Sequence, residues 1–329
     1  MRPEHAEHLV DPITKEPLQL AIHQQVGKHV MSGVLRSARN EYKITNGIPR
    51  LLPPDTAHTS SFQAHQQKNA HSFAYEWNNI YRENTYEKQN FLHFLNPFVR
   101  EQDLAGKKLL DVGCGSGRFT KQAALAGAKV VIGTDHGQSV EAAFALTSDL
   151  PNACIVQADI YHMPINAWAD VAFSIGVLHH LPEPEQGFRQ LPVTVRSGGQ
   201  VLIWVYNRRR NFRAVYIFET LRRITRHIPK PLLYRLGYAP AAGVHILNQI
   251  TLGLQELGRS KAARKIPFAY YANFPFSMKV NDAFDVFATP KSNYYYVEEI
   301  AAWFSHANLA RIKTHEHPEA GITAVGSLQ

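Results

Sequence analysis

A glycine-rich loop and two later acids are the residues of this 329-residue chain whose spacing suggests chemistry. Residues 109–117 read Leu-Leu-Asp-Val-Gly-Cys-Gly-Ser-Gly, so an apolar run ends in three alternating glycines. Glycines leave room where a ligand must approach the backbone. Asp135 ends the next apolar run, about 20 residues after Gly113, where a carboxylate can accept hydrogen bonds from a ribose diol. Asp159 ends the third run, a place that suits an adenine amino group. These residues predict a site for a nucleoside-containing cofactor.

The same loop argues against two other nucleotide sites. It lacks the Gly-Lys-Ser/Thr of a phosphate-binding ATPase loop. A nicotinamide dinucleotide site needs a third small residue where strand and helix touch, and the bulky Arg118 stands there instead. The glycines therefore favour a mononucleoside ligand over a triphosphate or a dinucleotide.

The elements that must position these residues are alternating strands and helices. Apolar runs that are buried on both faces and joined by helices predict a parallel sheet covered on both sides. Five such runs occur, at 108–112, 130–134, 153–157, 171–175 and 200–206, and a helix at 297–307 with strands at 311–315 and 322–327 resumes the pattern. We therefore expect an α/β fold with a Rossmann-like, doubly wound, mostly parallel sheet of about seven strands.

The remaining segments divide the chain. Residues 1–55 read as short strands and turns, and predict a small β-rich appendage. Residues 56–105 are helical and aromatic, and are expected to cover the cofactor. The sheet domain comprises 106–206 and 294–329. It is interrupted after the fifth strand by a helical, basic and aromatic insertion at 207–293, with helices expected near 212–227 and 243–257.

Composition sets the broad class. Hydrophobic residues make up 45% of the chain and there are two cysteines, so the chain is ordinary globular protein without a disulfide framework. The chain has no run of about 20 apolar residues, so no membrane-spanning helix is predicted. The N-terminus lacks the apolar core of a signal peptide. A cytoplasmic protein is the default expectation.

The net charge of +8 is concentrated in one stretch. Residues 207–235 hold one acid, Glu219, and nine cations: Arg208, Arg209, Arg210, Arg213, Arg222, Arg223, Arg226, Lys230 and Arg235. Four interpretations stay open: a solvated cationic face, attraction of an anionic substrate, peripheral contact with anionic lipid, or RNA binding without a recognisable RNA-binding module.

Taken together, the motifs resemble class I S-adenosylmethionine-dependent methyltransferases of the group that includes the ubiquinone and menaquinone enzymes. The loop at 109–117, the two acids, the segment 170–181 and the turn 196–200 match that family's motifs in order, with Arg-Ser replacing Lys-Pro in the turn. The resemblance implies S-adenosyl-L-methionine as cofactor. It also implies the following cofactor-binding residues: Asp111, Gly113, Cys114, Gly115, Gly117, Asp135, His136, Asp159, Ile160 and Ile175.

Two further groups of residues have both a chemical and a packing interpretation. His179 and His180 are candidate general bases for methylation of oxygen or nitrogen, although this pair often only packs in the family. Tyr75 and Trp77 lie in a segment that resembles the cofactor cover of related enzymes, where a ring can face the cationic sulfonium. The same rings are equally compatible with an ordinary core.

The N-terminal appendage resembles the small zinc-ribbon-like domain that activates tRNA and release-factor methyltransferases. Its cysteines are missing: Asp11 and Thr14 occupy their positions, and Cys114 is the first cysteine of the chain. Because the thiolates are absent, we expect no metal there.

The acceptor is expected to be a small molecule, such as a secondary metabolite, sugar or lipid-like compound, held under the insertion. Candidate substrate residues are Arg208, Phe274, Phe276 and Tyr295. Methylation of RNA or protein is the alternative within catalysis, and a non-catalytic cofactor-binding scaffold is the alternative outside it. The sequence does not specify the methylated atom or the oligomeric state.

Overall fold

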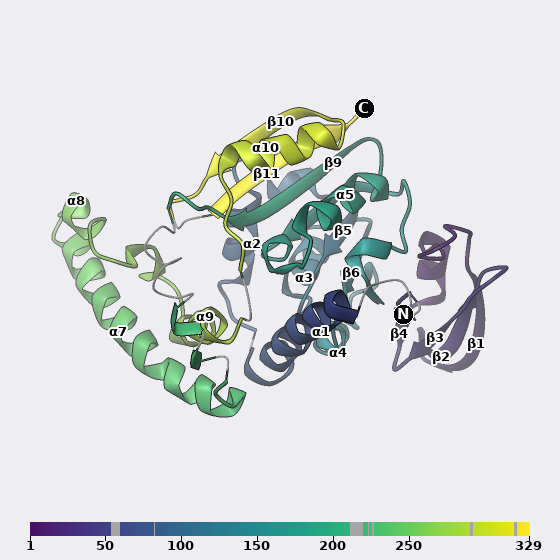
Figure 1. Ribbon diagram of the computed structural model, residues 1–329, viewed down its shortest axis with the longest axis horizontal. Coiled ribbons are helices and arrows are strands. Elements are labelled where there is room, and N and C mark those ends of the chain that lie inside the picture. Colours follow the sequence, from purple (N-terminus) through teal and green to yellow (C-terminus); the bar gives the residue numbers. More distant parts are fainter. Residues whose placement is uncertain are drawn as a thin grey trace.

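The computed structural model describes residues 1–53, 60–81, 83–210, 220–222, 224, 225, 227–289, 292–318 and 321–329. Within these residues, eleven strands form one sheet with the order β1-β2-β3-β4-β7-β6-β5-β8-β9-β11-β10 (Figure 1). The strands are β1 (Gln19–Val26), β2 (His29–Arg36), β3 (Glu41–Thr45), β4 (Ile48–Leu51), β5 (Lys108–Val112), β6 (Val130–Asp135), β7 (Ala153–Ala158), β8 (Ala169–Ile175), β9 (Val195–Tyr206), β10 (Leu309–Glu316) and β11 (Gly321–Leu328).

The seven strands from β7 to β10 in this order form the expected mostly parallel sheet. β5 to β9 pair in parallel, and β11 inserts antiparallel between β9 and β10. Sequence order reverses between β5 and β8, so their carboxyl ends open a crevice where open α/β sheets bind ligands. The predicted α/β, doubly wound and mostly parallel fold is confirmed.

Helices cover both faces of this sheet (Figure 1). On one face lie α2 (Glu87–Leu95), α3 (Arg118–Leu125) and α4 (Ser139–Thr147), and on the other α5 (Pro184–Thr194) and α10 (Val297–His306), while α1 (Ser60–Tyr75) packs beside α4. Each face has its own apolar core, one around Phe91 and Phe173, the other around Phe188 and Phe304. Buried Leu, Ile and Val alternate between the two cores along the central strands, which explains why those strands read as continuous apolar runs.

The N-terminal strands extend the central sheet. β4 pairs in parallel with β7, through Arg50 beside Gln157 and Leu51 beside Ala158. The Arg50 guanidinium also donates to the side chain of Gln157 on that neighbouring strand. The β-rich segment therefore shares one hydrogen-bonded sheet with the mostly parallel strands, although its domain boundary at residue 55 stays a prediction.

Asp11, which stands where the resembling domain has a cysteine, organises two turns of the appendage. Its carboxylate accepts hydrogen bonds from the backbone of Ile13 and Thr14 at 2.8 and 3.0 Å, and from the side chains of Ser37 and Asn40 at 2.6 and 2.9 Å. Burial opposes its charge, but these bonds together lower the pKa of Asp11 to about 2. A hydrogen-bonded carboxylate thus joins the two turns. Within the described residues no group of three metal-ligating side chains gathers.

The insertion forms a separate helical layer. It contains α7 (Lys230–Glu256), α8 (Ser260–Ala263) and α9 (Phe276–Ala288), and α7 and α9 pack closely on each other (Figure 1). The helix expected near 243–257 begins earlier, directly after Pro229. The aromatic segment beyond residue 268 contains α9, a helix that sequence analysis did not predict. The helix expected at 212–227 lies mostly outside the described residues, as do Arg213, Glu219, Arg223 and Arg226.

No helix in the described part of the chain is long and apolar enough to cross a membrane. The predicted cytoplasmic location stays a prediction.

Candidate functional site

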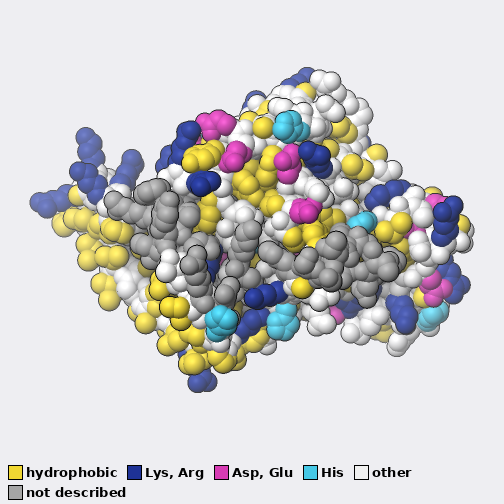
Figure 2. Space-filling model, in the orientation of Figure 1, with side chains coloured by type: hydrophobic (Ala, Val, Ile, Leu, Met, Phe, Trp, Pro, Cys, Tyr) yellow, Lys and Arg dark blue, Asp and Glu magenta, His cyan; other side chains and the backbone are white. Residues whose placement is uncertain are grey.

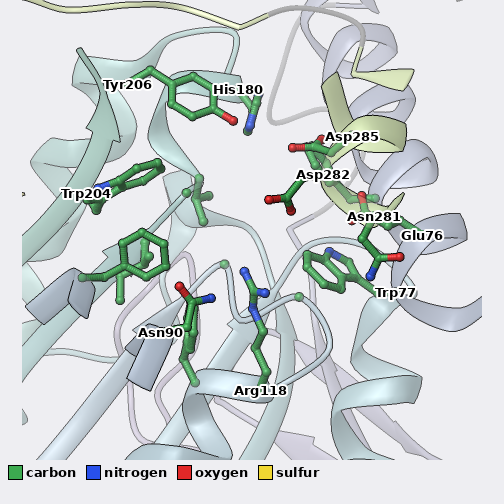
Figure 3. A pocket seen from close by; sticks show the side chains of 18 of the residues that line it. Glu76, Trp77, Asn90, Arg118, His180, Trp204, Tyr206, Asn281, Asp282 and Asp285 are labelled. Carbon is green, nitrogen blue, oxygen red and sulfur yellow. The ribbon is translucent and has the colours of Figure 1, made fainter. Parts of the chain in front are cut away.

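A cavity of about 960 Å³ lies at the carboxyl ends of the central strands. One wall comes from β9, with Trp204 and Tyr206, and the opposite wall from α9, with Asp282 and Asp285 (Figure 3). The glycine loop forms its floor, and α1, a π-helical turn (Glu76–Ile80) and α2 complete the enclosure. The insertion and the segment before the sheet therefore jointly cover the crevice.

The glycine loop fits a ligand that lies against the backbone. Gly113 has φ +80°, and a Cβ there would stand 2.4 Å from Cγ2 of Val177. Gly115 has φ +55°, and a Cβ there would lie 2.9 Å from Nε1 of Trp77. Both positions combine a left-handed backbone with a close neighbour, so only glycine fits without strain. The loop fits the close backbone approach expected for S-adenosyl-L-methionine.

The three acids of the predicted cofactor site have different surroundings. Asp135 lines the cavity and accepts hydrogen bonds from the backbone N–H groups of Gly115 and Gly137 at 3.0 and 2.9 Å. Asp159 lies just behind the wall, 1% exposed, where it accepts from Nε2 of Gln66 at 2.8 Å. Asp111 is buried below the loop, and burial raises its pKa to about 7 despite a hydrogen bond from Thr120. Asp135 is therefore the acid best placed to contact a ligand directly.

Most of the predicted cofactor residues come together around this cavity. Those that line it are Gly113, Cys114, Gly115, Asp135, His136, Ile160, Ile175 and Trp77. Asp111, Gly117, Asp159 and Tyr75 do not line it. Gly117 directly precedes α3, with φ +78° and beside Ala143, and Tyr75 packs on Phe284 with Nζ of Lys230 over its ring. A role for these four in binding stays a prediction.

The two candidate histidines differ in position. His179 is fully buried between the rings of His180 and Tyr206, with centroids 4.1 and 4.0 Å away, and it does not line the cavity. Burial lowers its pKa well below the usual range. His180 lines the cavity, and its ring points into it (Figure 3). Geometry therefore favours His180 as the candidate base and packing for His179.

Of the candidate substrate residues, only Phe274 lines the cavity. Its ring lies 4.5 Å from that of Tyr86, just before α2, and so connects the insertion to the opposite wall. Phe276 faces outward against Tyr238 and His245. Arg208 lies over the ring of Tyr296 outside the cavity, and Tyr295 packs on Trp303 in the sheet core.

Five charged residues of the cavity were missed by sequence analysis. They are Glu76, Arg118, Asp282 and Asp285, all labelled in Figure 3, and Glu87 is a fifth. Arg118 extends from the start of α3 across the ring of Trp77, 5.1 Å from its centroid. Its position directly after the last glycine was the available signal. The acids of α9 gave none, because Asp282 and Asp285 at helical spacing are also typical of a solvated face.

Comparison with known proteins agrees with this geometry. Residues 110–203, from β5 to β9, match the family profile described as a methyltransferase domain. Residues 110–203 of the chain therefore contain a methyltransferase domain, in agreement with the activity that the sequence motifs predict.

Individual relatives cover parts of the chain. A tRNA U34 carboxymethyltransferase of Idiomarina loihiensis is 37% identical over 107 residues, 31% of this chain and 33% of the relative. A ubiquinone biosynthesis O-methyltransferase of Chromobacterium violaceum is 35% identical over 127 residues, 36% of this chain and 54% of the relative. The chain thus matches about a third to a half of these relatives' length. Among solved structures, the magnesium protoporphyrin IX methyltransferase of Synechocystis PCC 6803 covers 83% of this chain and 99% of its own, with 12% identity and a TM-score of 0.47.

Proposed function

We propose that this protein transfers a methyl group from S-adenosyl-L-methionine to a small molecule that enters the cavity between β9 and α9. The observation that carries the proposal is the enclosure: helices from both flanks of the sheet domain cover the crevice and leave about 960 Å³. That volume is within the range of small-molecule sites and holds two ligands of modest size.

The residues of the chain then have distinct tasks. The glycine loop and Asp135 bind the cofactor, which when bound supplies a methyl group already activated on a positively charged sulfur. Trp77 and Phe274 exclude water from the cavity. Ring contacts from Phe73 and Tyr206, and Oγ of Ser292 at 3.4 Å from Nδ1, orient His180, which stands where it could take a proton from the acceptor. The main contribution of the protein is alignment of the two ligands.

RNA is the second candidate acceptor, because relatives named tRNA U34 carboxymethyltransferase match the sheet domain. The cavity disfavours it: five carboxylates and three guanidinium groups line its described part. An excess of carboxylates repels a phosphate backbone. A small molecule without phosphate meets no such repulsion.

Transfer of labelled methyl groups separates these candidates. The protein, incubated with methyl-labelled cofactor and either a metabolite extract or total tRNA, is expected to label a compound of small-molecule size. Label in tRNA alone would establish the RNA alternative. A protein that binds the cofactor and labels neither fraction would be a scaffold, and the proposal would be wrong.

We further propose that the insertion makes a peripheral contact with an anionic lipid surface, through α7 and α8. The predicted contact at 207–235 falls partly outside the described residues, whereas α7 exposes an apolar stripe at helical spacing. Its members are Leu232, Leu236, Ile246 and Ile250, with Leu257 directly after the helix, each at least half exposed. Exposed cations follow at Arg259, Lys261, Arg264 and Lys265 (Figure 2). Apolar area beside cations is typical of helices that lie on anionic membranes.

Vesicle sedimentation checks this contact. The protein is expected to bind vesicles of phosphatidylcholine with phosphatidylglycerol, and to bind pure phosphatidylcholine vesicles far less. Ile246→Glu is expected to weaken binding about tenfold or more, since it places a charge in the apolar stripe. Val193→Glu, at an exposed apolar residue of α5, is the matched control. Equal loss in both variants, or a stable dimer that buries α7 without lipid, would contradict the proposal.

A further inference from the structure

The α9 wall of the cavity carries more carboxylate than its cationic neighbours balance. Glu76, Asp282 and Asp285 interact electrostatically with one another across the space between the π-helical turn and α9. Figure 3 shows Asp282 extending into the cavity, with Asp285 and Glu76 on the same side. Arg118 and Arg222 are the nearby lining cations. Nε of Arg222 donates to the backbone oxygen of Val286 at 2.6 Å. Nη1 of Arg118 lies 3.9 Å from Oε2 of Glu87.

The acids on this wall have unequal support. The Tyr271 hydroxyl donates to Asp282 at 2.6 Å, and Oγ1 of Thr289 donates to Asp285. Glu76 is 5% exposed, and within the described residues its side chain has no hydrogen bond or ion pair, although the charge of Arg118 favours its ionised form. A buried carboxylate without a partner is costly, and the cost is removed by a ligand that brings positive charge. Glu87, which also lines the cavity, has no hydrogen-bond partner at Oε2, although Nη1 of Arg118 lies 3.9 Å from that oxygen.

The pKa values of these carboxyl groups reflect the same excess of negative charge. Burial, followed by the charges of Asp285 and Asp282, raises the pKa of Glu76 well above its usual range. Burial also raises the pKa of Asp282 to about 6, with the Tyr271 hydrogen bond opposing the rise and the charge of Asp285 adding to it. A cation bound among these carboxyls would favour their ionised forms.

Aromatic rings line the same cavity as the acids, both beside them and on the opposite wall. Trp77, Trp204, Tyr206 and Tyr271 line the same cavity. Ring faces attract cations, and carboxylates beside rings are the combination that recognises organic ammonium groups. An anionic or neutral polar molecule would leave the acid wall unpaired.

From this juxtaposition we infer that the acceptor is an organic amine, bound with its cationic nitrogen against Glu76, Asp282 and Asp285. This inference rests on the proposed function, since it specifies the acceptor of that same cavity. It also assigns a role to the insertion: α9 supplies the acids that select the acceptor, whereas the arginines at 208 and 209 lie over Tyr296 outside the cavity.

A set of three probes of matched shape tests the inference by binding alone. 3-Phenylpropylamine, 3-phenyl-1-propanol and 3-phenylpropionate present a cation, a neutral group and an anion on the same skeleton. Calorimetry in the presence of S-adenosylhomocysteine excludes turnover, so the outcome does not depend on whether methyl transfer occurs. The amine is expected to bind at least about tenfold more tightly than the alcohol, and the propionate most weakly.

Variants locate the selectivity. Asp282→Asn keeps an oxygen for the Tyr271 hydroxyl and removes the charge, so it is expected to lower amine affinity about tenfold and leave alcohol affinity unchanged. Glu76→Gln is the second variant. Glu298→Gln, which removes an exposed acid paired with Arg209 outside the cavity, is the control with no expected effect.

One competing source of positive charge is the cofactor itself. If the acids serve its sulfonium, Asp282→Asn will weaken S-adenosyl-L-methionine but not S-adenosylhomocysteine, whose sulfur is uncharged. If they serve the α-ammonium group that both molecules carry, both will bind more weakly. In either case amine affinity will not change. That result would overturn the inference, as would an amine that binds no better than the alcohol or not at all. Loss of amine affinity with an unchanged ratio of the two cofactor affinities would confirm it.

Discussion

Asp135→Ala is expected to weaken binding of S-adenosyl-L-methionine about ten- to hundredfold, or about 1.5–3 kcal/mol. The carboxylate lines the cavity at the end of β6, where hydrogen bonds to a ribose are lost with it. It also accepts from the backbone N–H of Gly115 at 3.0 Å and from Oγ of Ser139 at 2.8 Å. The substitution therefore removes a ligand contact and a support of the loop together.

Calorimetric titration with the cofactor and with S-adenosylhomocysteine measures this loss. Asp149→Ala makes the same chemical change at an exposed acid that does not line the cavity, and its affinities should equal those of the wild type. Circular dichroism verifies that both variants are folded. An unchanged dissociation constant in Asp135→Ala would exclude the cavity as the cofactor site.

The sheet could be predicted in detail because its signals are local. β5 occupies the predicted residues 108–112, and the runs predicted at 130–134 and 153–157 became β6 and β7 with one added residue each. Strands buried on both faces require continuous apolar residues, and the glycine loop requires φ above zero. Such requirements act on neighbouring residues, so they are visible in a single sequence.

The union of the N-terminal strands with the central sheet could not be predicted in this way. It depends on β4 meeting β7 across more than 100 residues of chain, with two paired positions. The turns held by Asp11 were equally hidden, since Ser37 and Asn40 are ordinary turn residues until the fold brings them to that carboxylate.

The acid wall of the cavity was missed for a related reason. Along the chain, Asp282 and Asp285 are two polar residues beside Lys279 in an aromatic segment. Met278, Val280 and Phe284 are buried residues of α9. Because α9 packs on α7, both acids lie on the side of α9 that faces the crevice. Only that tertiary arrangement brings the two aspartates close to Glu76. The sequence analysis considered attraction of an anionic substrate by the arginines of the insertion, and this gave no indication of an acidic wall.

Phe274→Ala is expected to lower acceptor turnover about tenfold or more while cofactor affinity stays within about threefold. The ring of Phe274 lies 5.0 Å from Tyr271 on the insertion and 4.5 Å from Tyr86 before α2, so it closes the cavity between two segments distant in sequence. Truncation opens that closure to water and removes apolar area from the acceptor side. The glycine loop and Asp135, which we propose bind the cofactor, belong to other elements that line the cavity.

Phe276→Ala is the matched control, because the two phenylalanines are two residues apart and lie on opposite sides of the cavity wall. Phe276 is 37% exposed and packs on His245 of α7. Its loss is expected to change turnover less than threefold. Steady-state rates at saturating cofactor, with cofactor affinity measured separately, give the comparison. If both variants lose turnover equally, the insertion acts through its overall stability, and Phe274 has no specific place over the acceptor. If Phe274→Ala instead loses cofactor affinity, Phe274 contacts the cofactor rather than the acceptor, and the cofactor extends beneath the insertion.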